Sequence, residues 1–125
     1  MKHYPIIAAN WKMHKTSNDS AKFYNDLKGA FKQINNVEII LSVPFTSLNS
    51  FNAEPPFFKA AQNCHWEDSG AYTGEISVQM IKELGTKYVI VGHSERRHIF
   101  GEKNSDINLK VISISKYGLK PILCV

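Results

Sequence analysis

The sequence has 125 residues, of which 43% are hydrophobic and 21% are charged, and its formal net charge is +4. This composition is typical of one soluble globular domain and argues against a disordered chain. The basic residues are scattered apart from the run 96–98, and no known nucleic-acid-reading module is visible, so we expect no nucleic-acid partner.

The cysteines and the N-terminal residues argue against a zinc-binding, a secreted or a membrane-spanning protein. Cys64 and Cys124 form no C-x-x-C pair, and His65 beside Cys64 cannot complete a closed zinc site by itself, so we expect reduced thiols and no metal. The apolar run before Asn10 is four residues long, too short for a signal-peptide core or a membrane span. We therefore expect a cytoplasmic protein that binds no membrane.

Short apolar runs predict five strands, of which those at 5–9 and 89–91 are expected to be buried. The first, 5–9, continues directly into Asn10, Trp11 and Lys12. The others are expected at 37–43, 57–61, 89–91 and 119–125. Runs of small and β-branched residues without polar alternation fit the strands of a parallel sheet that is covered on both faces.

Helices are predicted between these strands. The segment 17–34 has apolar residues at helical spacing, the last of them Ile34, with a cap among residues 17–19. Only a short helix fits before the Pro55–Pro56 pair. Two further helices are expected, one over 77–84 that ends at Gly85, and one that is capped at 104 or 105 and ends at Gly118.

The repeated order of strand and helix predicts a parallel sheet with right-handed crossovers and about four and a half βα units. An open doubly wound sheet could be complete at this length, whereas a closed (β/α)₈ barrel needs about 250 residues. Spacing alone does not decide between them.

His93 follows the predicted strand 89–91 at the position where sites form in α/β proteins, between a strand end and a helix start. Ser94 is a candidate N-cap, and Glu95 suits the first helical turn. A helix N-terminus facing an imidazole disfavours its charged form, which predicts a neutral His93 able to donate a hydrogen bond to a carbonyl. A lone loop histidine would more often cap the strand, but ionisable groups of both signs gathered here favour an organised network.

The segment 65–74 is predicted to be a long loop with two glycines. Loops of this length in compact domains tend to be functional or to reach a partner, and the alternative is a mobile surface excursion.

Five stretches carry a resemblance to a known family: A-N-W-K-M at 9–13, A-Q-N at 61–63, G-A-Y-T-G-E-I-S at 70–77, V-G-H-S-E-R-R at 91–97 and K-P-I-L-C-V at 120–125. In these stretches, their order and their spacing, the chain resembles the N-terminal half of triosephosphate isomerases. The resemblance implies the α/β fold of the TIM (β/α)₈ barrel family, with residues 1–125 as the N-terminal part of a single barrel domain. It thereby favours the barrel over the open sheet.

The resemblance implies interconversion of dihydroxyacetone phosphate and glyceraldehyde 3-phosphate, a step of glycolysis and gluconeogenesis, with no cofactor. His93 would be the electrophile, Lys12 the catalytic lysine that binds substrate, and Asn10 a substrate contact beside it. Glu95 would hold Lys12 in place, and Ser94 belongs to the same turn. The family is itself the standard example of a neutral histidine at a helix N-terminus, so the two lines of reasoning about His93 are not independent.

The resemblance also implies a homodimer in which the loop around Thr73 inserts into the neighbouring subunit and approaches that subunit's catalytic lysine. The implied interface positions are Thr73, Gly74, Glu75, Gln62 and Asn63.

The family's catalytic glutamate and phosphate-binding loops are expected beyond residue 125, and neither Glu75 nor Glu102 matches that base. We therefore expect the chain alone to be inactive, and its open sheet edges to promote aggregation or pairing. One alternative is a catalytically inactive module that associates with intact isomerase subunits. Another is a phosphate-binding module without chemistry, which rests on Lys12 and the net charge.

Overall fold

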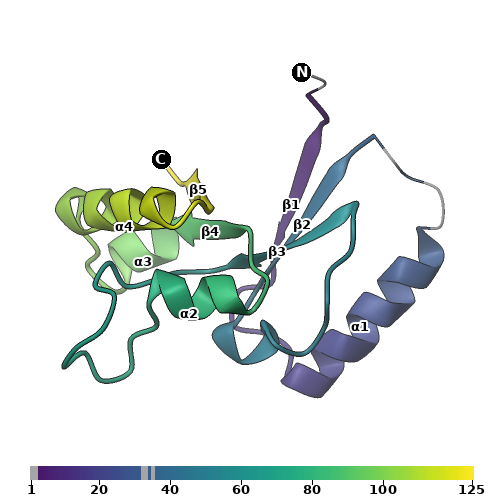
Figure 1. Ribbon diagram of the computed structural model, residues 1–125, viewed down its shortest axis with the longest axis horizontal. Helices are drawn as coiled ribbons and strands as arrows, with labels where there is room; N and C mark the ends of the chain where they lie inside the picture. The colour runs from purple at the N-terminus through teal and green to yellow at the C-terminus, as the bar shows by residue number, and fades with distance from the viewer. Residues whose placement is uncertain (1–2, 32–33, 35) are drawn as a thin grey trace.

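Five parallel strands form one sheet in which spatial order follows chain order (Figure 1). The strands are β1 (Ile6–Asn10), β2 (Glu38–Val43), β3 (Phe57–Ala61), β4 (Tyr88–Val91) and β5 (Lys120–Leu123). The computed structural model describes residues 3–31, 34 and 36–125. A doubly wound sheet reverses its strand order at a switch point, and these five strands show no reversal. The order is that of part of a (β/α)₈ barrel, which answers the question that spacing left open.

Helices connect the strands: α1 (Ser17–Ala30), the 3₁₀ helix η1 (Phe45–Ser47), α2 (Val78–Glu83), α3 (Ser94–His98) and α4 (Asn104–Lys116). The predicted strand 57–61 is confirmed, with the same first and last residues in β3. The short helix predicted before Pro55 is η1. None of the helices in the described ranges is long and apolar enough to cross a membrane.

Side chains alternate between the two faces of the sheet. On the face covered by the helices, Leu41 and Val89 pack with Tyr24, Ile81 and Ile114 in the main core. The other face carries a smaller buried cluster of Ile40, Ala60 and Tyr88, with Phe58 and Ile122 partly buried against it. Successive side chains of a strand point to opposite faces, and here both faces contain buried residues. Continuous apolar runs, rather than alternating ones, therefore encode the strands.

β1 is covered less than the other strands. Ile6 and Ile7 are 57% and 59% exposed, and β1 pairs with β2 alone among the described strands. The apolar run 5–9 was predicted to be buried, and in these residues that prediction is wrong. Burial of a β1 side chain requires a neighbour that the described residues do not supply.

The helix caps differ from the predicted ones by one residue. α1 is capped by Thr16, whose Oγ1 accepts the Asp19 N–H (3.3 Å), while Asp19 Oδ2 accepts the Thr16 N–H (3.1 Å). This reciprocal box needs an acid three residues after the hydroxyl, and it excludes residues 17–19 as the cap. α1 ends at Ala30, so Ile34 lies beyond the helix.

At α4 the cap residue is Lys103 rather than residue 104 or 105. Its backbone N–H donates to Asp106 Oδ2 at 3.0 Å, which supplies half of a capping box without a cap hydroxyl.

Lys59 is a buried lysine on the face of β3 that the helices cover, and it is 3% exposed. Its Nζ donates to the carbonyl oxygens of Leu48 (2.7 Å), Phe51 (3.0 Å) and Leu84 (2.5 Å). Burial lowers the pKa of the ammonium, whereas three carbonyl dipoles favour its charged form. Lys59 therefore connects the segment after η1 and the end of α2 to the sheet.

Replacing Lys59 with Met keeps most of the side-chain volume and removes the ammonium. Because each unpaired buried polar group costs about 1–3 kcal/mol, we expect the free energy of unfolding to fall by roughly 2–4 kcal/mol. Urea denaturation followed by circular dichroism measures the change. Lys22→Met, on the exposed side of α1, is the control, and equal stabilities for the two variants would contradict the assigned role of Lys59.

Candidate active site

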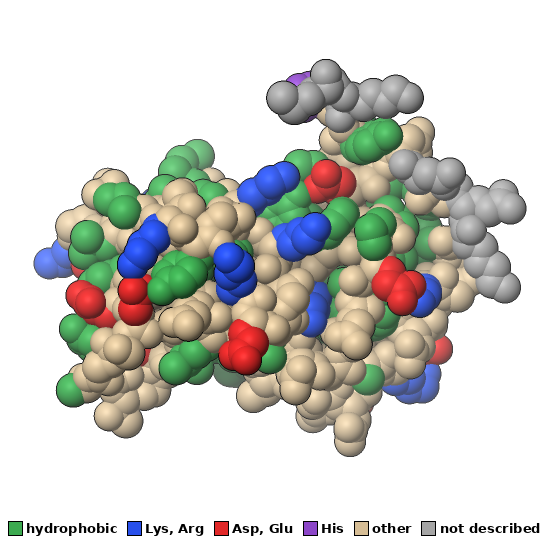
Figure 2. Space-filling model, viewed as in Figure 1, with side chains coloured by type: hydrophobic (Ala, Val, Ile, Leu, Met, Phe, Trp, Pro, Cys, Tyr) green, Lys and Arg blue, Asp and Glu red, His purple; other side chains and the backbone are tan. Residues whose placement is uncertain are grey.

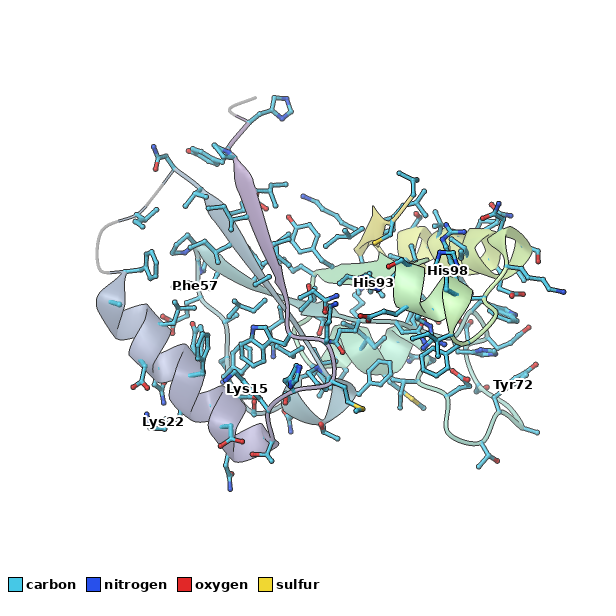
Figure 3. All side chains as sticks on the ribbon, turned by 180° about the vertical axis from the view of Figure 1, so that it is seen from behind. Lys15, Lys22, Phe57, Tyr72, His93 and His98 are labelled. Carbon is cyan, nitrogen blue, oxygen red and sulfur yellow. The ribbon has the colours of Figure 1, made fainter. Side chains whose placement is uncertain are left out.

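A pocket of about 270 Å³ lies at the carboxyl ends of the strands. Asn10 ends β1, Gln62 follows β3, and His93 follows β4 beyond Gly92. All three line the pocket together with Lys12 and Glu95. Figure 3 shows His93 between the end of the sheet and α3. The structure thus brings together four residues predicted for the site, Asn10, Lys12, His93 and Glu95.

The loop after β1 holds Lys12 in an unusual backbone conformation. Its φ is 53°, in the left-handed region that a residue with a side chain seldom adopts. The Lys12 N–H donates to Asn10 Oδ1 (2.9 Å), and Gln62 Nε2 donates to the Lys12 carbonyl (2.8 Å) and to the Ser42 carbonyl (3.1 Å). Gln62, implied only as an interface residue, therefore supports the loop of Lys12 within its own chain.

Lys12 and Glu95 form an ion pair across the pocket. The distance from Lys12 Nζ to Glu95 Oε1 is 2.8 Å, and both side chains are partly exposed. The hydrogen bond from Lys12 holds the pKa of Glu95 below its usual value, so the carboxylate stays ionised at neutral pH. The lysine ammonium is thereby fixed at one side of the pocket.

His93 is itself the N-cap of α3, and the prediction that Ser94 caps this helix is wrong. His93 Nδ1 accepts the backbone N–H of Glu95 at 3.2 Å. With Nδ1 facing this N–H, Nε2 is the ring nitrogen left to face the pocket as a donor. Ser94 lies at the first residue of α3 and is not among the described residues that line the pocket.

A buried ionic network beside the pocket was missed by sequence reasoning. The Glu102 carboxylate, 4% exposed, accepts from Arg96 Nε (2.6 Å) and from Lys110 Nζ (3.0 Å). Lys110 also donates to Asn63 Oδ1 (2.8 Å), which gives Asn63 a contact inside its own chain. Because Arg96 and Asn63 line the pocket, the network fixes part of its wall. No sequence motif marks such a network, since the fold alone brings the four residues together.

Gly92 permits a close contact between the His93 turn and α4. Its φ is 69°, and a Cβ there would lie 2.8 Å from Arg97 Nη2 and 2.9 Å from Ile107 Cδ1. Arg97 uses this space to donate to the carbonyls of Gly92 (2.7 Å) and Cys124 (3.0 Å), which ties α3 to the end of β5. Glycine is therefore required directly before His93.

The long loop after β3 is packed at its base and exposed at its tip, and it projects from the body of the molecule (Figure 1). The His65 ring contacts the rings of Trp66 and Tyr72, with centroids 4.3 and 4.6 Å away. At the tip, Thr73 and Gly74 are exposed. The loop thus combines an ordered base with a tip free for contact.

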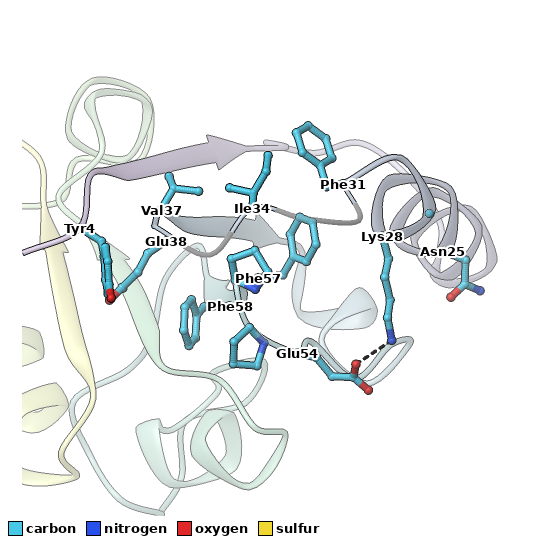
Figure 4. Close-up of a pocket in the computed structure, with 13 residues that line it drawn as sticks. Tyr4, Asn25, Lys28, Phe31, Ile34, Val37, Glu38, Glu54, Phe57 and Phe58 are labelled. Atoms are coloured by element: carbon cyan, nitrogen blue, oxygen red, sulfur yellow. Dashed lines mark hydrogen bonds and ion pairs between the residues drawn. The ribbon is translucent and has the colours of Figure 1, made fainter.

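A larger pocket, about 810 Å³, lies away from all the predicted site residues (Figure 4). It is lined mainly by apolar side chains such as Phe57 and Phe58, and Lys28 and Glu54 form an ion pair at 2.7 Å in its wall. Apart from this ion pair, in which each charge is occupied by the other, its described lining residues do not include an acid and a base in contact. In the described ranges, moreover, no three His, Cys, Asp or Glu side chains are grouped as metal ligands would be.

Replacing Glu102 with Gln removes the shared anion of the network and leaves the buried Lys110 without a charged partner. Breaking a buried ion pair on one side costs about 3–5 kcal/mol, so we expect a loss of stability of this order in urea denaturation. Glu83→Gln, on the exposed side of α2, serves as the control. If Glu102→Gln unfolded at the same urea concentration as this control, the network would not contribute to stability.

Comparison with known proteins gives a consistent result. The triosephosphate isomerase family model matches residues 5–125. The triosephosphate isomerase of Gloeothece citriformis is 49% identical over 124 residues, which cover 96% of this chain and 52% of that protein. For the enzyme of Aquifex aeolicus the identity is 46% over 123 residues, covering 96% and 50%.

A solved structure agrees with these sequences. The crystal structure of triosephosphate isomerase from Bartonella henselae superposes with a TM-score of 0.88 at 36% identity, covering 98% of this chain and 52% of that chain. The chain spans about half the length of the curated relatives it matches. With a family match over 5–125 and the same strand order, the chain belongs to the triosephosphate isomerase family.

Proposed function

We propose that this chain supplies the electrophile and the substrate-binding lysine of a triosephosphate isomerase, which interconverts dihydroxyacetone phosphate and glyceraldehyde 3-phosphate in the cytoplasm. The observation that carries the proposal is the convergence of His93, Lys12 and Asn10 on one pocket, with Lys12 held by Glu95 at 2.8 Å. Sites at the carboxyl ends of barrel strands support this class of chemistry.

In this proposal Lys12 provides fixed positive charge. Its ammonium stabilises the phosphate dianion of the substrate and the oxyanion that develops as the enediolate forms. Because Glu95 and the Gln62 hydrogen bond hold Lys12 before substrate arrives, little reorganisation is needed on binding. Asn10 Oδ1 is occupied by the Lys12 N–H, so its amide NH₂ is the group available to a substrate oxygen.

His93 polarises the substrate carbonyl. With Nδ1 engaged by the Glu95 N–H, the Nε2 proton can be donated to the carbonyl oxygen. A neutral imidazole can both donate that proton and take it back within the reaction, which an imidazolium does less readily.

The proton on the substrate carbon needs a separate base. Glu95 is the one carboxylate among the described residues that line this pocket, and its oxygen is bound to Lys12. Its lowered pKa makes it a weak base. We therefore assign Glu95 a positioning role and place the base outside this set of residues.

The substrate-binding role is tested by titrating dihydroxyacetone phosphate into the chain by calorimetry. Lys12→Met is expected to weaken binding by about tenfold or more, because it removes the one lysine among the described residues that line the pocket. Lys15→Met, in the same loop but outside the pocket, is the matched control. Equal affinities for these two variants would refute the role of Lys12.

An isomerase assay run beside this titration, with His93→Gln to reveal contaminating host enzyme, tests the assignment of the base. We expect no activity above that background. Activity that is lost in His93→Gln would show that a base lies within this chain.

A second candidate is a catalytically inactive module that binds an intact isomerase subunit, and the projecting loop favours it. In either case we propose that Thr73, Gly74 and Glu75 enter a partner subunit as in a homodimer, with Thr73 approaching the partner's catalytic lysine. The exposed tip on an ordered base supports such insertion.

Capture of the chain on the immobilised isomerase of Bartonella henselae tests the loop contact. Thr73→Arg is expected to reduce capture by about tenfold or more, because a long charged side chain at the loop tip obstructs a close interface. Lys22→Glu on α1 controls for a change of surface charge. Equal capture of Thr73→Arg and the unaltered chain would exclude the loop from the contact.

A further inference from the structure

We propose that a second pocket, at the N-terminal ends of β4 and β5, binds a small phosphate-type anion. The pocket is about 440 Å³ and is formed by the segments where α2 and α4 lead into these strands. Its wall contains Lys82, Lys87 and Lys120 and, among the described residues, no aspartate or glutamate. It lies at the end of the sheet opposite His93, so it is separate from the candidate active site.

A repeated sequence pattern builds this pocket. Gly85-Thr86-Lys87 precedes β4, and Gly118-Leu119-Lys120 leads into β5. Both glycines have a left-handed φ, 74° and 75°, in the turn that ends each helix. The Lys120 N–H donates to the Lys87 carbonyl at 2.9 Å, so parallel pairing of β4 and β5 brings the two lysines to one end of the sheet.

The three pocket lysines differ from other surface lysines in their pairing. Lys22, Lys28 and Lys116 each pair with a carboxylate elsewhere on the surface. By contrast, none of the three pocket lysines has an ion pair within the described part of the chain.

One nearby carboxylate offsets part of this charge, because Glu38 accepts the hydroxyl hydrogen of Tyr88, which lines the pocket. Glu83 of α2 is absent from the lining, so the three lysines leave an excess of positive charge. Figure 2 shows Lys and Arg side chains on the face over the end of α2 and the starts of β4 and β5, with an Asp or Glu side chain beside them. Like charges around one hollow repel each other, and a bound anion relieves that repulsion.

Aromatic rings hold two of the ammonium groups in place. Lys87 Nζ lies 5.2 Å from the centre of the Phe58 ring, and Lys120 Nζ lies 5.5 Å from that of Tyr88. Cation–π contacts of this kind restrict long side chains without consuming their charge. The lysines are therefore partly ordered before any ligand binds.

Thr86 supplies an independent sign of a missing partner. It lines the pocket, is 4% exposed, and its hydroxyl has no hydrogen-bond partner within the described residues. Buried hydroxyl groups nearly always have one. A phosphate oxygen, or a water molecule bound to it, is an acceptor that would satisfy this hydroxyl. The pocket volume suits a small molecule, and lysines are common phosphate ligands.

The test uses inorganic pyrophosphate as the probe, titrated into the ¹⁵N-labelled chain. We expect saturable shifts of the amide signals of residues 85–88 and 118–120. The double variant Lys87→Gln/Lys120→Gln should weaken binding by at least about tenfold. Thr86→Val, which keeps the shape and removes the hydroxyl, should weaken it to a smaller extent. Lys22→Gln removes a lysine from α1 and should leave the affinity unchanged.

Two control measurements separate binding in this pocket from binding at the candidate active site and from salt effects. Lys12→Met removes the proposed substrate site, so shifts at residues 85–88 that persist in this variant belong to the second pocket. Sodium chloride at matched ionic strength reveals any effect of screening alone. Shifts that chloride reproduces, or an affinity unchanged in the double lysine variant, would overturn the proposal.

Discussion

Lys12 and Glu95 meet at 2.8 Å although three strands, β2 to β4, and the helices between them separate the two residues in the chain, and the candidate site depends on this contact. The contact exists because β1 to β4 run parallel and in order, which brings the ends of β1 and β4 to the same rim. The pair then sets the geometry of its surroundings. It directs the ammonium of Lys12 into the pocket that His93 also lines, and it commits the Glu95 carboxylate to that lysine.

Three buried or partly buried cations hold loops and helices to the sheet. Lys59 is bound by carbonyls, Lys110 by Glu102 and Asn63, and Arg97 by the carbonyls of Gly92 and Cys124. In each case a long side chain joins a loop or a helix to the sheet through hydrogen bonds rather than apolar contact. Such cations are costly to bury, so the sites keep their partners in a narrow range of positions.

Local patterns predicted the strands and the strand–helix order because burial on both faces leaves a direct record in residue type, as in 57–61. They placed Asn10, Lys12, His93 and Glu95 at strand ends or turns, and the resemblance predicted that these residues meet. The caps were less predictable, because Thr16 and His93 act through hydrogen bonds that depend on the exact residue where helical geometry begins. The roles of Gln62 and Lys110 could not be predicted from local sequence, because Gln62 binds Lys12 across 50 residues and Lys110 binds Asn63 across 47. The contacts of Glu102 are closer in sequence, but no motif marks them. Lys59 lies within an apolar run, and only the fold shows that its ammonium faces three carbonyl oxygens.

The order of the strands also bears on how the chain acquires its structure. Each strand pairs with the one just before it in the sequence, so every ladder closes a loop no longer than the intervening connection. The entropy lost in closing such loops is modest, and no pair among the five described strands waits for a distant partner. During synthesis on the ribosome, β2 can therefore dock on β1 before β4 has emerged. The rim that carries the candidate site is assembled only at the fourth strand, because His93 and Glu95 reach Lys12 after β4 has joined the sheet.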